Sequence, residues 1–152
     1  LLRGAIDRGH EADTAWLPVL DECIRLYEEA TRLTEAQVKD REASIHYMRR
    51  YNYAGVINDT GLMLMYYPAR KDLDRAEEYF LRALQLTQDG YRDAWENLTK
   101  LYLDQQRWEE AYELNRDCAE SITLQDGSPH PHRSQAASIA DKLVRDGKVE
   151  GD

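Results

Sequence analysis

The residues of this chain that could do chemistry are two closely spaced histidines, a cysteine and several acidic pairs. His130 and His132 flank a proline, and imidazole nitrogen is a common zinc ligand. A zinc site needs three or four protein ligands, however, and alternate side chains of an extended X-Pro segment need not converge. The other two histidines, His10 and His46, lie far away in the sequence. We therefore expect a solvated loop here, with no metal.

Cys118 is the best candidate for a nucleophile, because a thiol beside a histidine base can be activated. It shares a helical face with Ala111 and Asn115, where a packed thiol is expected. The acidic pairs lie off the apolar stripes of their helices. Glu78, for example, is followed four residues later by Arg82, so surface ion pairs explain the acidic residues better than a catalytic role does. The sequence contains no Gly-rich phosphate loop, nucleophile elbow or HExxH motif. These patterns predict a protein that is not an enzyme and uses no cofactor.

Composition favours a helical globular chain. Of the 152 residues, 42% are hydrophobic and 32% charged, with eight glycines and four prolines. The net charge of −9 opposes binding to nucleic acid or to an anionic membrane surface. The most apolar run, residues 61–69, is far shorter than the roughly 20 residues that span a bilayer. Cys23 and Cys118 have no CxxC or disulfide-framework spacing, which favours free thiols and an intracellular setting.

Apolar residues recur every three or four positions along most of the chain, which is the period of an amphipathic helix. Residues 14–33 keep this pattern throughout and predict one helix. Residues 35–67 contain no proline, so they fit either one very long helix or two helices broken near Asn52. Pro68 ends this segment, because proline lacks the backbone donor and clashes with the preceding turn.

The second half of the chain predicts four more helices separated by turn residues. Asp72 is a suitable N-cap for the first of them, and the pair Asp89-Gly90 ends it, with glycine suited to the left-handed C-terminal position. A short turn at 104–106 separates the next two helices. The segment 124–132 contains a glycine and two prolines, so we expect a loop before the last helix.

Two stretches of the chain contain the same helical hairpin. Gly61 and Thr99 occupy matching places in the first helix of each, and Ala76 and Ala111 match in the second, 35 residues apart (111 − 76). Such small residues lie where two helices come closest, and large residues one turn away fill the space beside them. A unit of this length cannot bury its apolar face alone, so neighbouring units must stack. The last helix, which Gly147 can end, repeats the spacing of Trp95, Leu98, Thr99 and Tyr102 through Ala136, Ile139, Ala140 and Leu143.

From about residue 54 to 146 the chain resembles the tetratricopeptide repeat (TPR) family, whose period is about 34 residues. The second copy has the family's order of Trp-x2-Leu-x3-Tyr followed by Ala-x3-large. The resemblance implies an all-α fold of stacked antiparallel helical hairpins in a right-handed superhelix, with long N-terminal helices and a C-terminal capping helix. In this interpretation one helical-repeat domain, 1–152, contains N-terminal helices (1–53), a first repeat (54–88), a second repeat (89–123), a loop (124–132) and the capping helix (133–147).

Two features depart from the family pattern. Gly61 and Ala76 are 15 residues apart, whereas Thr99 and Ala111 are 12 apart, so the first hairpin has three extra residues. Asn115 stands where the family has an aromatic residue. A buried asparagine without hydrogen-bond partners costs about 1–3 kcal/mol, so we expect the loop after residue 122 to supply those partners.

Members of this family bind protein or peptide segments in a concave groove, which the first helix of each hairpin faces. The resemblance therefore implies a non-catalytic peptide-binding module that serves protein–protein interaction as a scaffold. It places ten residues on the groove: Asn58, Asp59, Leu62, Met65 and Tyr66 from the first repeat, and Asp93, Glu96, Asn97, Lys100 and Asp104 from the second.

The charge of this groove predicts its partner. Four acidic groove residues accompany a single Lys100, so we expect a basic or extended peptide whose binding weakens with salt. Tyr66 and Leu62 would supply the apolar contact, and Asn97 a contact with the peptide backbone. Some family members hold a partner's C-terminal carboxylate with Asn and Lys or Arg, which Asn97 and Lys100 match in part. The neighbouring acids repel a carboxylate, so that activity is not carried over.

A second interpretation stays open. The sequence starts at Leu1 rather than Met, which favours a regulatory or self-assembly domain of a larger protein. In that case the groove is filled by the protein's own chain or by a second copy, and the protein forms homo-oligomers.

Overall fold

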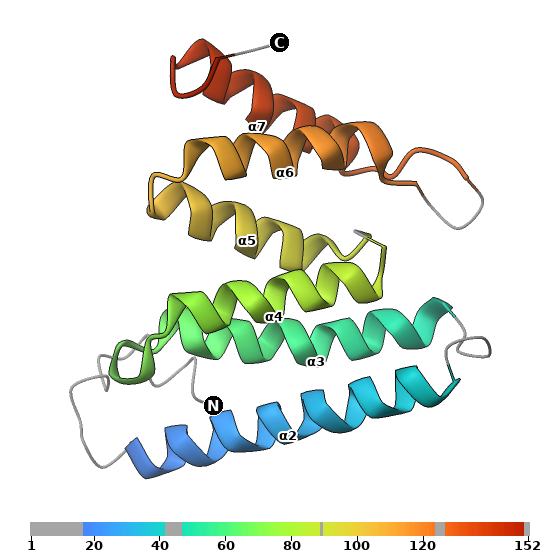
Figure 1. Cartoon of the computed structure of the whole chain (residues 1–152), viewed down its shortest axis with the longest axis vertical. Coiled ribbons are helices and arrows are strands. Elements are labelled where there is room, and N and C mark those ends of the chain that lie inside the picture. Colours follow the sequence, from blue (N-terminus) through green and yellow to red (C-terminus); the bar gives the residue numbers. More distant parts are fainter. Residues whose placement is uncertain (1–16, 42–46, 89, 124–126, 151–152) are drawn as a thin grey trace. The chain divides into compact units, whose positions relative to one another are not determined.

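The computed structural model describes residues 17–41, 47–88, 90–123 and 127–150 (Figure 1). Over these ranges the chain is all-α and forms no strand, which confirms the predicted all-α class. It divides into two compact units, Leu1–Ala83 and Leu84–Asp152, which are described one at a time below. The elements are α2 (Leu17–Arg41), α3 (Tyr47–Tyr66), the 3-10 turn η3 (Pro68–Arg70), α4 (Leu73–Leu86), α5 (Arg92–Asp104), α6 (Trp108–Ser121) and α7 (Arg133–Arg145).

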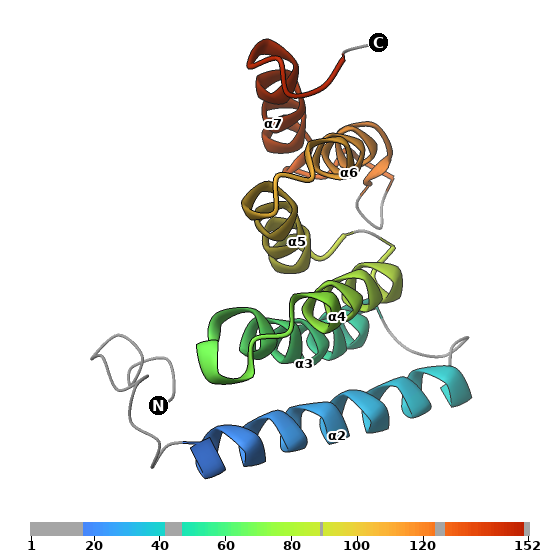
Figure 2. The ribbon, with the colours of Figure 1, turned by 60° about the vertical axis from the view of Figure 1, so that its left-hand side comes forward.

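The first unit contains α2, α3, η3 and most of α4, with α2 packed along α3 (Figures 1 and 2). The helices are joined by a buried hydrogen bond of 3.1 Å between the hydroxyls of Thr31 and Thr60. Helix α3 runs through Asn52 without interruption, and α2 extends to Arg41, so neither of the two alternatives for residues 35–67 is found. The two helices are separated instead by residues 42–46, which lie outside the described ranges.

Helices α3 and α4 come close together at a glycine. A Cβ atom added to Gly61 would lie 2.7 Å from Cε1 of Phe80 and 3.1 Å from the backbone oxygen of Ala76. Phe80 and Ala76 are both completely buried. Only glycine leaves room at this position, which agrees with the role that the repeat pattern assigns to it.

Helix α4 begins as the sequence predicts, but its C-terminal end differs from the prediction. Helix α3 ends just before Pro68, and the N–H of Arg75 donates to Oδ1 of Asp72 at 3.1 Å, so the predicted N-cap is confirmed. At the other end the left-handed residue is Gln88, with φ of 52°, rather than Gly90. A positive φ is uncommon for residues other than glycine. The turn after α4 thus lacks the glycine that usually occupies this position.

The second unit contains α5, α6 and α7, and α6 packs against both of the others. Buried Asn115 of α6 donates from Nδ2 to Oγ1 of Thr99 at 3.2 Å and to the backbone oxygen of Ala111 at 2.7 Å. The partners of Nδ2 therefore come from α5 and from its own helix, and not from the loop after residue 122 as expected. Oδ1 of Asn115 has no partner within the described ranges.

Helix α7 has the predicted third copy of the first-helix spacing. Ala136, Ala140 and Leu143 are buried, and α7 packs against α6. Gly147 has φ of 65° and donates to the backbone oxygen of Val144, while the next N–H donates to Leu143, which completes a Schellman motif. The prediction that this glycine ends the helix is confirmed.

Other sequence-based expectations concern the thiols and the membrane. Cys23 and Cys118 are free cysteines, the first partly exposed and the second buried. Among the residues that the structure describes, none of the helices is both long and apolar enough to cross a membrane.

The close crossings predict a specific sensitivity to side-chain size. Ala76 and Ala111 are 0% exposed, so Ala76→Leu or Ala111→Leu should lower the free energy of unfolding by about 1–3 kcal/mol through overpacking. Ala119→Leu on α6 is the matched control, because this residue lines an open surface hollow. Chemical denaturation measures all three. If Ala111→Leu cost no more than Ala119→Leu, the close crossing would not exist.

Candidate functional site

The ten predicted groove residues divide equally between the two units. In the first unit they lie on α3 and differ in exposure. Asn58 and Met65 are 2% and 5% exposed, so they offer a ligand almost no surface. Asp59 and Tyr66 are exposed, and Leu62 is half-buried. The usable groove residues of this unit are therefore three of the five.

In the second unit, α5 and α7 form a hollow of about 400 Å³. Three predicted groove residues line it: Glu96, Lys100 and Asp104. Asp93 is exposed and Asn97 half-buried, and neither is part of the lining. The remaining lining residues are Trp95, Thr99, Leu103, Gln135 and Ile139.

Gln135 and Ile139 were missed because the prediction took groove residues only from the first two hairpins. A signal for them existed, since the spacing of α7 matches that of α5. Treating α7 as the first helix of a third hairpin would have placed its outward residues on the same surface. The hollow is thus bounded by two helices that hold equivalent places in the repeat.

The charges of the hollow are paired along α5. Arg92 and Glu96 form an ion pair of 2.6 Å, and Lys100 and Asp104 one of 2.8 Å. Gln135 of α7 also donates to Oε1 of Glu96 at 3.4 Å. These side chains are about half exposed, and such i, i+4 pairs are worth only about 0.3–0.5 kcal/mol. A charged ligand can therefore exchange partners with them at little cost.

The apolar side of the hollow contains a buried donor. Trp95 is 2% exposed, and its Nε1 has no hydrogen-bond acceptor within the described parts of the chain. Leu103 and Ile139 are half-buried beside it. The hollow thus combines apolar walls with charges of both signs.

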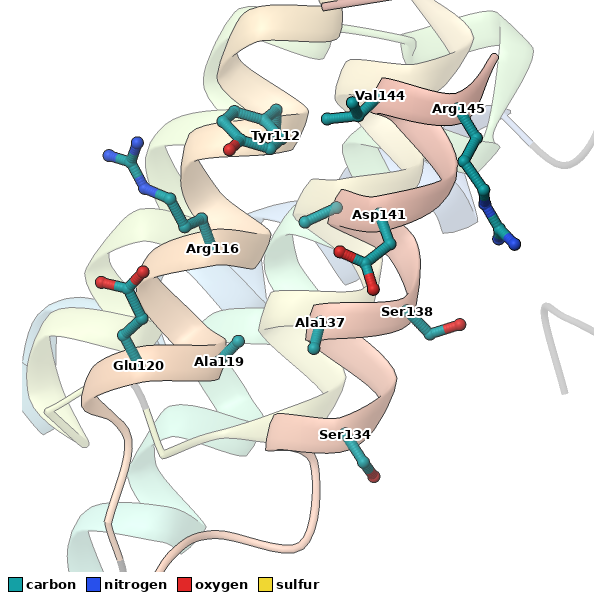
Figure 3. A pocket seen from close by; sticks show the side chains of 11 residues that line it. Tyr112, Arg116, Ala119, Glu120, Ser134, Ala137, Ser138, Asp141, Val144 and Arg145 are labelled. Carbon is teal, nitrogen blue, oxygen red and sulfur yellow. The ribbon is translucent and has the colours of Figure 1, made fainter. Parts of the chain in front are cut away.

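A second and larger hollow, of about 1010 Å³, lies between α6 and α7 (Figure 3). Ala119 and Ala137 line its middle, and Tyr112 and Val144 its end near the C-terminus of α7 (Figure 3). The side chains of Arg116 and Glu120 extend outward from α6 and that of Arg145 outward from α7, whereas Asp141 points toward the space between the two helices (Figure 3). The lining of this hollow thus combines small and apolar side chains with polar and charged ones.

The two histidines lie together at the start of α7. Their ring centroids are 4.3 Å apart, so the side chains of His130 and His132 do converge, contrary to the expectation from the X-Pro segment. Nδ1 of His130 accepts a hydrogen bond from the backbone N–H of His132 at 3.2 Å. The backbone N–H of His130 donates to the backbone oxygen of Ile122. His130 is 8% exposed. The backbone bond to Ile122 ties this loop to the end of α6, and the expectation of a solvated loop is wrong for His130.

The environment of both imidazoles disfavours their charged form. Burial lowers the pKa of His130, and the neighbouring His132 lowers it further. Burial also lowers the pKa of His132, as does Arg92, while Glu96 and Asp93 oppose this effect. Protonation of His130 would in addition turn the accepting Nδ1 into a donor and break its hydrogen bond.

Within the described ranges, no group of three or more His, Cys, Asp or Glu residues could hold a metal ion. No protein-family model, curated protein or solved structure was found that matches this chain.

The histidine pair predicts how stability changes with pH. Both histidine pKa values lie below 6.5 in the folded protein, so the unfolded chain binds more protons, and stability falls as pH drops below about 6.5. Free carboxyl groups with pKa values near 4.5 begin to bind protons below about pH 5.5, so denaturation should be compared between about pH 7.5 and 5.5. His130→Gln should flatten this dependence. An unchanged slope in that variant would show that the pair is not responsible.

Proposed function

We propose that this chain is a non-catalytic module that binds an extended peptide segment of a partner protein, and that its hairpins stack as in TPR proteins. The hollow between α5 and α7 is the proposed binding site in the second unit. One observation carries the proposal. Three predicted groove residues line this hollow together with apolar side chains from both helices. A volume near 400 Å³ is within the range of ligand sites and fits a few peptide residues.

The equivalence of the hairpins supports the TPR-like part of the proposal. Gly61 meets Phe80 at the first crossing, and Thr99 meets Asn115 at the matching place in the second. The order of small residue on the first helix and larger residue on the second is thus kept in both hairpins. Helix α7 adds a third first-helix copy beside α6, as stacking requires.

The lining of the hollow indicates how a peptide would bind. Leu103 and Ile139 would contact an apolar side chain of the peptide. Glu96 and Asp104 would pair with basic side chains. These acids already pair with Arg92 and Lys100 at the surface. A basic side chain of the ligand would replace one ion pair by another, so it would add specificity more than affinity.

The net charge supports a basic ligand. The lining contains two acids and one lysine, on a molecule with a net charge of −9. A field of this sign accelerates the approach of a cationic segment and weakens as salt is added. In the first unit, exposed Tyr66, half-buried Leu62 and exposed Asp59 are the residues that would contact the partner.

The alternative function is a regulatory or self-assembly domain of a larger protein. The observation that favours it is an exposed apolar stripe on α2, which contains three of the large hydrophobic side chains that the structure exposes. This surface is separate from the hollow, so the two functions are compatible.

A peptide array followed by titration at two salt concentrations tests the proposed function. The hollow should select basic peptides, and their affinity should fall with added salt. Glu96→Lys combined with Asp104→Lys should weaken binding at least about tenfold, because it reverses both acidic contacts.

The matched control is Glu109→Lys combined with Glu113→Lys, which changes the net charge equally but lies on α6, away from the hollow. It should retain most of the affinity, since it affects only the long-range field. Selection of acidic peptides, or equal losses in the two double variants, would refute peptide binding at this hollow.

A further inference from the structure

Helix α2 has two apolar stripes, and only one of them is covered. Leu20 and Ile24 belong to the stripe that is buried within the first unit, together with the hydroxyl of Thr31 that bonds to α3. The other stripe contains Val19, Leu26 and Leu33, whose exposed fractions are 46%, 51% and 48%. Single exposed apolar side chains need no explanation, but three on one face of one helix form a continuous patch.

The exposed stripe has the spacing of a helix–helix seam. Cys23 and Ala30 lie between the three large residues, and both are only partly exposed. The steps between consecutive members are four, three, four and three residues, which is the a/d pattern of a coiled coil. Large and small side chains alternate along this seam, which is Val19, Cys23, Leu26, Ala30 and Leu33.

The charges beside the seam are balanced. Glu22 pairs with Arg25 at 2.7 Å and Glu29 pairs with Arg32 at 2.6 Å, one heptad apart. Two acids and two bases give this side of α2 no net charge, although the whole molecule has −9. Two copies of the chain can therefore approach along α2 without the like-charge repulsion that other surfaces would cause.

We propose that two copies of this protein associate through the exposed seam of α2, with the two helices antiparallel about a two-fold axis. In this register Leu26 lies opposite the partner's Ala30, and Leu33 lies opposite the partner's Cys23. Each large side chain thus meets a small one, as close packing requires, and the symmetry repeats every contact.

A parallel pairing would instead place leucine opposite leucine and the small residues opposite one another, which leaves voids between the helices. The alternation of residue size therefore selects the antiparallel orientation.

Sedimentation equilibrium of the full chain tests the association. The parent should show a concentration-dependent monomer–dimer equilibrium, and Leu26→Glu should be monomeric, because the seam would bury two unpaired carboxylates. Leu81→Glu on α4 is the matched control, since this leucine is 44% exposed and lies off the seam. It should dimerise like the parent. Circular dichroism confirms that both variants fold.

Disulfide trapping tests the register. In Leu33→Cys, the new thiol of one copy should form a disulfide with Cys23 of the other, while oxidised glutathione is reduced to two glutathione thiols. The two positions are ten residues apart on one helix, or about 15 Å, so they cannot link within a copy. Leu81→Cys should give no such dimer, and Cys23→Ser in the Leu33→Cys background should abolish it.

Each result decides the proposal. A parent that stays monomeric at all concentrations, or a Leu26→Glu variant that still dimerises, would overturn the α2 interface. A covalent dimer of Leu33→Cys that survives Cys23→Ser would indicate a parallel pairing and overturn the antiparallel register. None of these measurements depends on the peptide-binding hollow, so the two proposals fail independently.

Discussion

The close crossing of two helices within each hairpin is the constraint on which the rest of the structure depends. In the first hairpin the crossing is possible because Gly61 leaves room for the ring of Phe80. In the second hairpin, Thr99 and Asn115 occupy the matching places. Their side chains join the two helices by a hydrogen bond, whereas in the first hairpin an aromatic ring packs against a glycine. Buried alanines lie beside both crossings. Two different chemical solutions thus maintain the same geometry.

Features that depend on local sequence could be predicted, and features that depend on packing could not. The end of α3 before Pro68 and the Asp72 cap follow from backbone chemistry that neighbouring residues determine. The partners of Asn115 could not be identified, because its place in the sequence does not reveal which helix lies opposite. The burial of Asn58 and Met65 was missed for a similar reason, since helical spacing alone does not show how much of α3 is covered.

The surfaces left open by this packing explain the proposed roles of the chain. Pairing α5 with α6 and α6 with α7 leaves a hollow between α5 and α7, where surface ion pairs can exchange with a ligand's charges. On α2 one stripe is used inside the first unit and another stays exposed, with balanced charges beside it. Peptide binding and self-association would therefore use different helices, and one could be altered without the other.

The most direct test of the shared crossing is to transplant one solution into the other hairpin. Thr99→Gly alone should lower the free energy of unfolding, because the amide of Asn115 loses its partner on α5. Asn115→Phe alone should also lower it, because the ring would clash with Thr99. The double variant, which copies Gly61 and Phe80, should recover most of that loss, with a coupling energy of at least about 1 kcal/mol. Losses that simply add would contradict the account, because the two residues would then not share one crossing.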